Sequence, residues 1–384
     1  MTTKMHRRDF LKGAAAVSGA ALLAGCGGGG AADTGPGTAA PVTHPPIDQE
    51  SGTLSIGEWP GYEAGGTKVQ TYGLTAGSDY VKTYGASSLV YTDIGNDDKV
   101  LNKVRAGTQY DLIHPCVGYV HDWANSGTVQ PFDPAELSNL ANLYPKMVTA
   151  GQVDGKQYWV PWDWGYSSIL YRTDKVDPAD ATGWELFWNA KYKGHISLWD
   201  GGSAPGVIAG LVLGVDDIWN QTPEELAASK AKLIEQKPLN KYYWTDYYGQ
   251  LWPDFESGDI WITYAWPDMY ATMKEKLDVE YMDPSQGQLA WVCGFVMGKD
   301  TQNWHHCHQY VNDFISKQNC INLTNTFYYG SADSTVVADD IDNQDLAAKL
   351  RIGDPAALDP PVHIDSYIAN RAEYQAMWEE VKAS

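Results

Sequence analysis

The residues of this sequence that are best suited to chemistry are aromatic. The 384-residue chain holds 16 Trp and 24 Tyr but only 7 Phe, a bias toward rings with a polar group, which are favoured where one edge meets water. The negative face of such a ring attracts a cation by about 0.5–2 kcal/mol. A single Trp is more often a core residue, but the set predicts a binding surface. Several of these rings follow expected strands: Trp59, Tyr62, Trp162, Trp164, Trp199, Trp266 and Trp291.

Sequence signatures of catalysis, metals and cofactors are missing. The sequence has no G-x-S-x-G, no H-E-x-x-H and no phosphate-binding Gly loop followed by Lys-Ser/Thr. The run at 305–308, H-H-C-H, cannot share one helix face, because consecutive residues point about 100° apart. We expect no metal, no cofactor and no catalysis. A secreted glycan-acting enzyme, with two carboxylates about 5–9.5 Å apart across a cleft, is the weakest alternative. The acidic pairs at 97–98, 216–217 and 339–340 are expected to be solvated caps or turns.

The first 50 residues indicate export and not folding. Arg7 and Arg8 begin an R-R-D-F-L-K motif, and the small-residue run 13–24 is too short for a comfortable membrane span. This pattern predicts a twin-arginine signal over residues 1–25. L-A-G-C at 23–26 resembles a bacterial lipobox, which implies lipidation of Cys26 and anchoring at the membrane surface. A plain cleavable signal is the alternative. Residues 26–50 are predicted to be a flexible tether.

The remaining body, from residue 51 to residue 384, is long enough for two lobes with separate cores. The chain has a formal net charge of −21, which repels phosphate backbones, so we expect no nucleic-acid partner. Five cysteines occur, at 26, 116, 293, 307 and 320. Export allows disulfides, and Cys307 with Cys320 is the expected local pair, with buried free thiols as the alternative.

Strand and helix patterns alternate along the body, which predicts α/β lobes. Strands are expected over 53–58, 110–114, 158–164, 168–171, 196–199, 260–265, 279–282 and 289–297. Helices are expected over 96–106, 119–125, 205–213, 223–236, 246–257, 304–317, 320–327 and 366–382. Asn96 is expected to cap the first of these helices, and Thr222 with Glu225 forms a capping-box pattern before the fourth.

Five motifs in a fixed order resemble the spermidine/putrescine-binding proteins of ABC importers. They are Y-D-L-I-H-P at 110–115 with Y-V at 119–120, Y-W-V-P-W-D-W-G at 158–165, W-E-L-F-W at 184–188 with K-Y-K-G at 191–194, Y-A-W at 264–266, and A-W-V-C-G at 290–294. The resemblance runs from about residue 53 to about residue 380. It implies a two-lobe type II periplasmic-binding-protein fold, in which crossing strands join the lobes and a hinge closes them on the ligand.

The resemblance also implies the organisation of the protein. Lobe 1 would comprise 51–164 plus 292–335, and lobe 2 would comprise 165–291 plus 336–384. A protein of this kind is expected to be a monomer that binds a small cationic ligand. It would present that ligand to an ABC permease from the periplasm or the outer face of the cytoplasmic membrane.

Matching positions give the expected ligand site. Trp59, Tyr62, Trp266 and Trp291 fall where the family places rings along the polyamine, and Cys116 falls where it has a hydroxyl contact. Three family acids are missing, since their positions are Gly201, Ala204 and Cys293. A buried ammonium without a partner is costly, so other acids must substitute or the ligand is not a polyamine. A quaternary amine such as choline or betaine, or an amino-acid-like solute, is the alternative.

The acids placed by pattern to substitute are Glu58, Asp93, Asp163, Asp200 and Asp268. The resemblance places Cys116 and Cys293 in the cleft, as two free thiols or as a disulfide. The expected ligand-binding residues are Trp59, Tyr62, Cys116, Asp163, Trp164, Asp200, Trp266, Asp268, Trp291 and Cys293.

Overall fold

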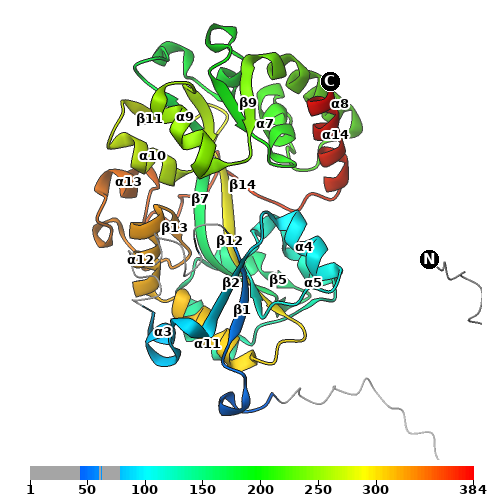
Figure 1. Ribbon diagram of the computed structural model, residues 1–384, viewed down its shortest axis with the longest axis vertical. Coiled ribbons are helices and arrows are strands. Elements are labelled where there is room, and N and C mark those ends of the chain that lie inside the picture. The colour runs from blue at the N-terminus through cyan, green and yellow to red at the C-terminus, as the bar shows by residue number, and fades with distance from the viewer. Residues whose placement is uncertain (1–43, 60–61, 63–77) are drawn as a thin grey trace, which may run out of the picture. The chain divides into compact units, whose positions relative to one another are not determined.

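The computed structural model describes residues 44–59, 62 and 78–384 (Figure 1). The predicted signal, Cys26 and most of the predicted tether lie outside the described residues. Within these residues, no helix combines the length and the apolar character needed to cross a bilayer.

A single mixed sheet organises the described part of the chain. Its strand order is β2-β1-β3-β12-β7-β10-β8-β9. These strands are β1 (Leu54–Glu58), β2 (Leu89–Asp93), β3 (Leu112–Ile113), β7 (Trp159–Arg172), β8 (Ile196–Trp199), β9 (Asn240–Trp244), β10 (Ile262–Ala265) and β12 (Leu289–Gly298). The short strands β4 (Val129–Gln130), β11 (Val279–Tyr281), β13 (Gly330–Ser331) and β14 (His363–Ile364) branch from it, while β5 (Gln152–Val153) pairs with β6 (Lys156–Gln157).

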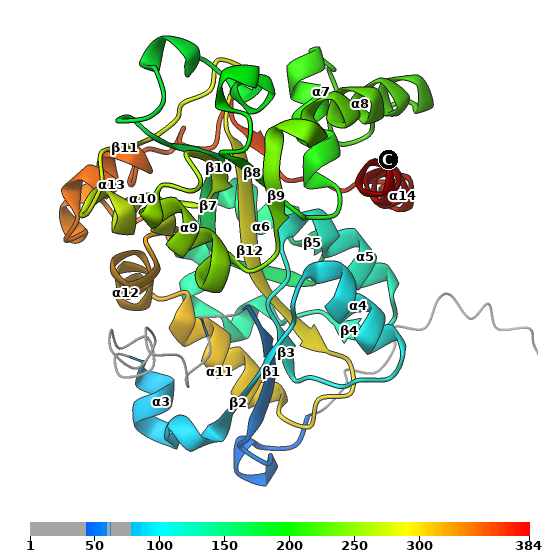
Figure 2. The same cartoon turned by 45° about the horizontal axis from the view of Figure 1, so that its top comes forward.

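The central pair β7 and β12 joins two lobes. The two strands run antiparallel through most of their length and cross from the lower to the upper half of the molecule (Figures 1 and 2). Around them, β1 pairs in parallel with β2 and β3 in one half, and β8 pairs in parallel with β9 and β10 in the other. Nearly every residue of β7 is buried, as expected for a strand covered on both faces.

Helices cover each half of the sheet (Figure 1). In the half that contains β1 these are α3 (Asp79–Tyr84), α4 (Asp97–Arg105), α5 (Val120–Asn125), α6 (Pro145–Ala150), α11 (Trp304–Phe314) and α12 (Lys317–Phe327). In the other half they are α7 (Ala204–Leu213), α8 (Pro223–Gln236), α9 (Trp252–Ser257), α10 (Pro267–Lys274), α13 (Gln344–Lys349) and α14 (Arg371–Ala383). The predicted α/β lobes are therefore present, while the lobe limits given above stay a prediction.

Local signals fixed two helix starts as expected. The Asn96 side chain accepts a hydrogen bond from the Lys99 N–H at 2.8 Å and begins α4. Thr222 and Glu225 form the predicted capping box of α8. The cap at Asn96 matters for the site, because it sets where Asp97 and Asp98 lie.

Two expectations about strand limits and disulfide pairing were wrong. The strands expected over 158–164 and 168–171 are one strand, since residues 165–167 also pair with β12. Cys307 and Cys320 are both free and buried. The Cys307 thiol points to the Asp111 carbonyl at 3.7 Å, and that of Cys320 points to the Phe314 carbonyl at 3.9 Å. The two sulfurs therefore contact different backbone segments, and closeness in sequence did not bring them together.

Candidate functional site

A cavity of about 400 Å³ lies between the lobes. One face of the paired strands β7 and β12 forms the floor of the cavity. Because successive strand residues point to opposite faces, Asp163 and Ser167 face the cavity from β7, and Trp291 and Cys293 face it from β12. The close approach of Trp291 to β7 requires a glycine opposite, since a Cβ at Gly165 would lie 2.6 Å from the indole.

Seven of the ten predicted ligand-binding residues line this cavity. They are Trp59, Tyr62, Cys116, Asp163, Trp266, Trp291 and Cys293. The rings expected from distant parts of the sequence therefore meet around one hollow and are not scattered among separate cores.

The other three predicted residues do not line the cavity. Trp164 points to the opposite face of β7 from Asp163, and its Nε1–H donates to the Ser331 carbonyl at 3.0 Å. Asp200 accepts the Trp378 Nε1–H at 2.6 Å and pairs with Lys382 on α14.

Asp268 is 1% exposed and lies behind the cavity wall. It accepts hydrogen bonds from the hydroxyls of Tyr247 and Tyr248. Of the remaining candidate acids, Glu58 is buried beneath the site and Asp93 is exposed, and neither lines the cavity. The sequence pattern placed these acids near the site but could not give the direction of their side chains.

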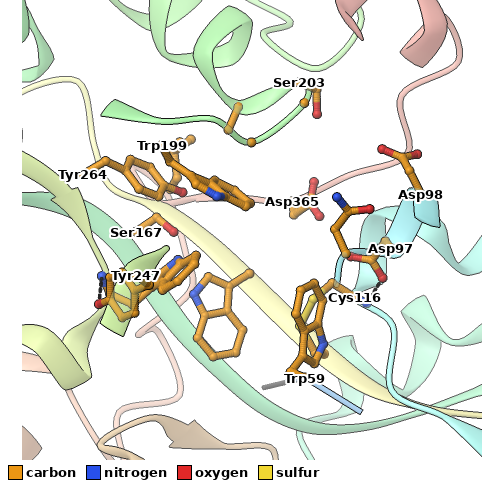
Figure 3. A pocket seen from close by; sticks show the side chains of 18 of the residues that line it. Trp59, Asp97, Asp98, Cys116, Ser167, Trp199, Ser203, Tyr247, Tyr264 and Asp365 are labelled. Atoms are coloured by element: carbon orange, nitrogen blue, oxygen red, sulfur yellow. Dashed lines mark hydrogen bonds between the residues drawn. A yellow bond between two sulfur atoms is a disulfide. The ribbon is translucent and has the colours of Figure 1, made fainter. Parts of the chain in front are cut away.

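A cluster of rings forms one side of the cavity (Figure 3). Trp199 ends β8, Trp244 ends β9 and Trp266 follows β10, so all three lie at the carboxyl ends of parallel strands, where α/β sheets bind ligands. Ring centroids are 5.4 Å apart for Trp199 and Trp266, and 4.7 Å apart for Tyr247 and Trp266. These edge-to-face contacts hold the rings in fixed orientations. Trp244 and Tyr247 were missed because β9 was not predicted.

The other side of the cavity contributes rings as well. Trp59 follows β1, and its Nε1–H donates to the His114 carbonyl at 2.8 Å. Tyr329 meets Trp291 edge to face at 4.8 Å. Aromatic faces therefore approach the same space from both lobes.

A buried ionic network supports the floor at Asp163. The His114 imidazole lies between two carboxylates, with Nδ1 2.6 Å from Glu58 Oε1 and Nε2 3.0 Å from Asp163 Oδ1. Burial opposes the positive charge, but the two carboxylates outweigh it and raise the pKa of His114 to about 10. The Tyr62 hydroxyl donates to the other Asp163 oxygen at 2.6 Å. Both oxygens of Asp163 are thus held by protein groups.

Cys116 and Cys293 form a disulfide in the cavity wall. Of the two states left open by the sequence, the structure has the oxidised one. The two residues oppose each other across neighbouring backbones, and Asp163 opposes Cys293 on the other side. The disulfide therefore lies beside Asp163 in the cavity wall, on the side that leads to α4.

A second group of acids, missed from the sequence, lines the cavity at the start of α4. Asp97, Asp98 and Asp365 all face it, together with Arg371, and Figure 3 shows the three carboxylates on the side away from Tyr247 and Tyr264. The expectation that Asp97 is a solvated cap was wrong, since it is 8% exposed. The signal that could have found it was the Asn96 cap, which fixes the helix start at the ends of β1 and β2.

Burial controls the charge of this group. Burial raises the pKa of Asp97 to about 7, opposed by the hydrogen bond from the Cys116 N–H and reinforced by Asp365 and Asp98. Burial also raises the pKa of Asp365 to about 6, against the attraction of Arg371. A bound cation would reverse these shifts, so the group is suited to bind positive charge.

Among the described residues, no three His, Cys, Asp or Glu side chains are grouped to hold a metal ion. His306 Nδ1 lies 2.9 Å from the Tyr80 hydroxyl, and His308 Nδ1 lies 2.8 Å from the Trp304 carbonyl. The consecutive histidines therefore contact separate partners.

Comparisons with known proteins identify relatives. Residues 88–349 match the family model for bacterial extracellular solute-binding proteins, and residues 4–24 match a twin-arginine translocation signal. The spermidine/putrescine-binding periplasmic protein of Salmonella typhimurium (strain LT2) is 22% identical over 328 residues, covering 85% of this chain and 87% of that protein. The putrescine-binding periplasmic protein PotF of Escherichia coli (strain K12) is 24% identical over 307 residues, covering 74% and 78%. These relatives are solute-binding proteins and not enzymes.

Solved structures share the fold. The spermidine/putrescine substrate-binding protein PotD of Streptococcus pneumoniae, in complex with calcium and HEPES, has a TM-score of 0.68 at 17% identity, covering 86% of this chain and 98% of that one. The binding protein MotA of A. tumefaciens B6, in complex with glucopine, has a TM-score of 0.67 at 13% identity, covering 86% and 99%. The predicted two-lobe type II fold and the resemblance noted in the sequence are both confirmed.

Proposed function

The chain belongs to the bacterial extracellular solute-binding protein family, and on that premise we propose that it captures a small organic cation of the polyamine class for an ABC importer. Membership in the family and the twin-arginine signal establish an exported solute-binding protein. The ligand, the anchor and the oligomeric state are the parts proposed here.

The observation that carries the proposal is the charge of the cavity. Among the described residues that line it, five are carboxylates and one is a guanidinium, that of Arg371. The carboxylates are Asp97, Asp98, Asp163, Asp246 and Asp365. Aromatic rings fill much of the remaining wall, and rings with carboxylates are the groups that bind organic cations.

Two observations keep a different solute as the second candidate. The positions where the family has acids, Gly201, Ala204 and Cys293, line this cavity without a carboxylate. A protein of the same fold, MotA, is described in complex with glucopine, which shows that the fold is compatible with other ligands. A quaternary amine or an amino-acid-like solute would use the rings and fewer carboxylates.

Isothermal titration calorimetry with putrescine, spermidine, choline and glycine betaine tests the proposal. The protein should first be unfolded and refolded to remove any ligand that co-purifies, and native mass spectrometry of the untreated protein would identify that ligand. We expect a 1:1 complex with an amine. If only neutral or anionic compounds bind, the cation proposal is wrong.

We also propose that lipidated Cys26 anchors a monomer at the outer face of the cytoplasmic membrane, where its lobes close on the ligand and deliver it to the permease. A Cys26→Ala variant should be exported but recovered in the soluble fraction. An unchanged membrane association would contradict the anchor, whatever the ligand is.

A further inference from the structure

We propose that Asp97, Asp98 and Asp365 form a subsite for an ammonium group that carries N–H bonds, so that the ligand is a primary amine and not a quaternary one. This inference rests on the proposed function and specifies it. The three acids occupy positions other than those of the missing family acids, Gly201, Ala204 and Cys293.

The geometry of Asp97 makes it the central acceptor. It is 8% exposed, and its Oδ1 accepts the Cys116 N–H at 3.1 Å. Its Oδ2 accepts no hydrogen bond from any described residue, although the side chain lines the cavity. Asp97 is buried as a residue but lines the cavity, so its second carboxylate oxygen takes its hydrogen bonds from a ligand or from water.

The disulfide helps to orient this carboxylate. Cys116, which supplies the N–H to Asp97, is tied through its side chain to Cys293 on β12. The backbone donor is thereby fixed to the central strand of the sheet. Asp97 is held at one oxygen, and its other oxygen keeps a constant direction.

Asp365 reaches the subsite because residue 118 is glycine. A Cβ at Gly118 would lie 2.7 Å from Asp365 Oδ2, which is closer than packed atoms approach. Arg371 is the only cationic side chain among the described lining residues. Its guanidinium stacks 3.7 Å from the centre of the Tyr119 ring and donates to the Gly118 carbonyl at 2.8 Å. One guanidinium faces three carboxylates, so a negative charge is left for the ligand to neutralise.

Asp98 lies where the two lobes meet over the subsite. Its Oδ2 accepts the Gln375 Nε2–H from α14 at 2.6 Å. A Cβ at Gly202, which precedes α7, would lie 3.8 Å from the same oxygen. Groups from both lobes therefore surround the acids, and an ammonium bound there is enclosed when the lobes approach.

The donor requirement separates the two classes of amine. A primary ammonium has three N–H donors and can satisfy several carboxylate oxygens at once, through charge-assisted hydrogen bonds. A quaternary nitrogen has none, so it would cover Asp97 Oδ2 with methyl groups and leave a desolvated carboxylate without a hydrogen bond. The ring cluster around Trp266 attracts either class and does not discriminate.

Matched pairs of amines provide the test. The pairs are ethanolamine with choline, glycine with glycine betaine, and putrescine with 1,4-bis(trimethylammonio)butane. Each pair shares a skeleton and differs only in methylation of nitrogen. Titrations followed by Trp fluorescence would give Kd values for the native protein, for Asp97→Asn and Asp365→Asn, and for Asp339→Asn as an exposed control of equal charge change.

We expect the primary member of a binding pair to bind at least tenfold more tightly than its methylated partner. One charge-assisted hydrogen bond contributes enough binding free energy for a difference of this size. That preference should fall several-fold or more in Asp97→Asn and Asp365→Asn and persist in Asp339→Asn. An unchanged preference in both subsite variants would overturn the inference and leave the proposed function intact. Equal or tighter binding of the methylated member would also overturn the inference, and it would favour the quaternary amine that is the second candidate for the ligand. Failure of every amine to bind would refute the proposed function itself.

Discussion

Replacing Asp97 by Asn should make the unliganded protein more stable at alkaline pH. Asp97 is 8% exposed, and burial raises its pKa to about 7. A carboxyl group whose pKa is higher in the folded state favours folding at low pH. That contribution is fully present below the unfolded pKa and is lost as pH rises through the folded pKa. Asn has no such dependence and can still accept the Cys116 N–H.

The size of the effect follows from the shift. Taking the unfolded pKa near 3.9, the buried carboxylate of Asp97 costs about 4 kcal/mol of folding free energy at pH 8 and about 1–2 kcal/mol at pH 5. The advantage of Asp97→Asn over the native protein should therefore grow by about 2–3 kcal/mol between these pH values. The comparison across pH removes any effect of the substitution that does not depend on protonation.

Urea denaturation of the ligand-free protein at pH 5 and pH 8 measures this difference. Asp339→Asn serves as the control, because Asp339 is exposed and its substitution should give no growth with pH. If the stability difference between Asp97→Asn and the native protein stays constant or shrinks as pH rises, the Asp97 carboxyl does not have a raised pKa, and the account of the acidic subsite is wrong.

Three further predictions concern the same cavity. His114→Gln should lower the free energy of unfolding by about 3–5 kcal/mol at pH 7, because it leaves the Glu58 and Asp163 carboxylates facing each other without a cation. Urea denaturation measures this loss of stability, and the double variant Glu58→Gln/His114→Gln should recover part of it. An unchanged free energy of unfolding in His114→Gln would contradict the buried ion network. Amine affinity should rise about tenfold or more from pH 5.5 to pH 8, because Asp97 and Asp365, with pKa values of about 7 and about 6, must lose protons to hold a cation. Calorimetry in two buffers of different ionisation enthalpy should detect proton release on binding, and proton uptake would exclude these groups as ligands. Trp266→Ala should weaken amine binding about 10–100-fold and Trp266→Phe much less, since each ring adds cation–π attraction and buried area. Equal Kd values for the native protein and both variants would show that the ring does not contact the ligand.

The sequence was most informative where the signal is local. Asn96 and Thr222 predicted helix starts because a cap needs only a side-chain oxygen and the next turn of backbone. Trp59, Trp199 and Trp266 were recognised as cleft candidates because each lies at or just after the end of a strand, and strand ends of an α/β sheet share one edge. Motif order along the chain then gave the family and the fold.

Signals that depend on pairing between distant segments were lost. The strands β2 and β9 were missed, and with β9 the rings of Trp244 and Tyr247. Among the described residues, β2 pairs with β1 alone and β9 pairs with β8 alone. The expected local disulfide was wrong for the same reason, because Cys307 and Cys320 are near in sequence and free. Cys116 and Cys293 are 177 residues apart in sequence and bonded, a pair that only the resemblance had suggested, as one of two states.

The sequence by itself determined the type of protein: an exported, two-lobe, ring-rich solute-binding chain with an excess of acids. Only the tertiary structure decided which acids line the cavity. Asp163, Asp200 and Asp268 all follow plausible patterns, but strand direction and side-chain partners place only Asp163 at the cavity. Asp97 and Asp365 reach it from helix and loop positions 268 residues apart, because the sheet brings the start of α4 beside the segment after β14. Composition gives only the number of carboxylates. Their charge and their position at the cavity depend on burial and on neighbouring groups, which are present only in the folded chain.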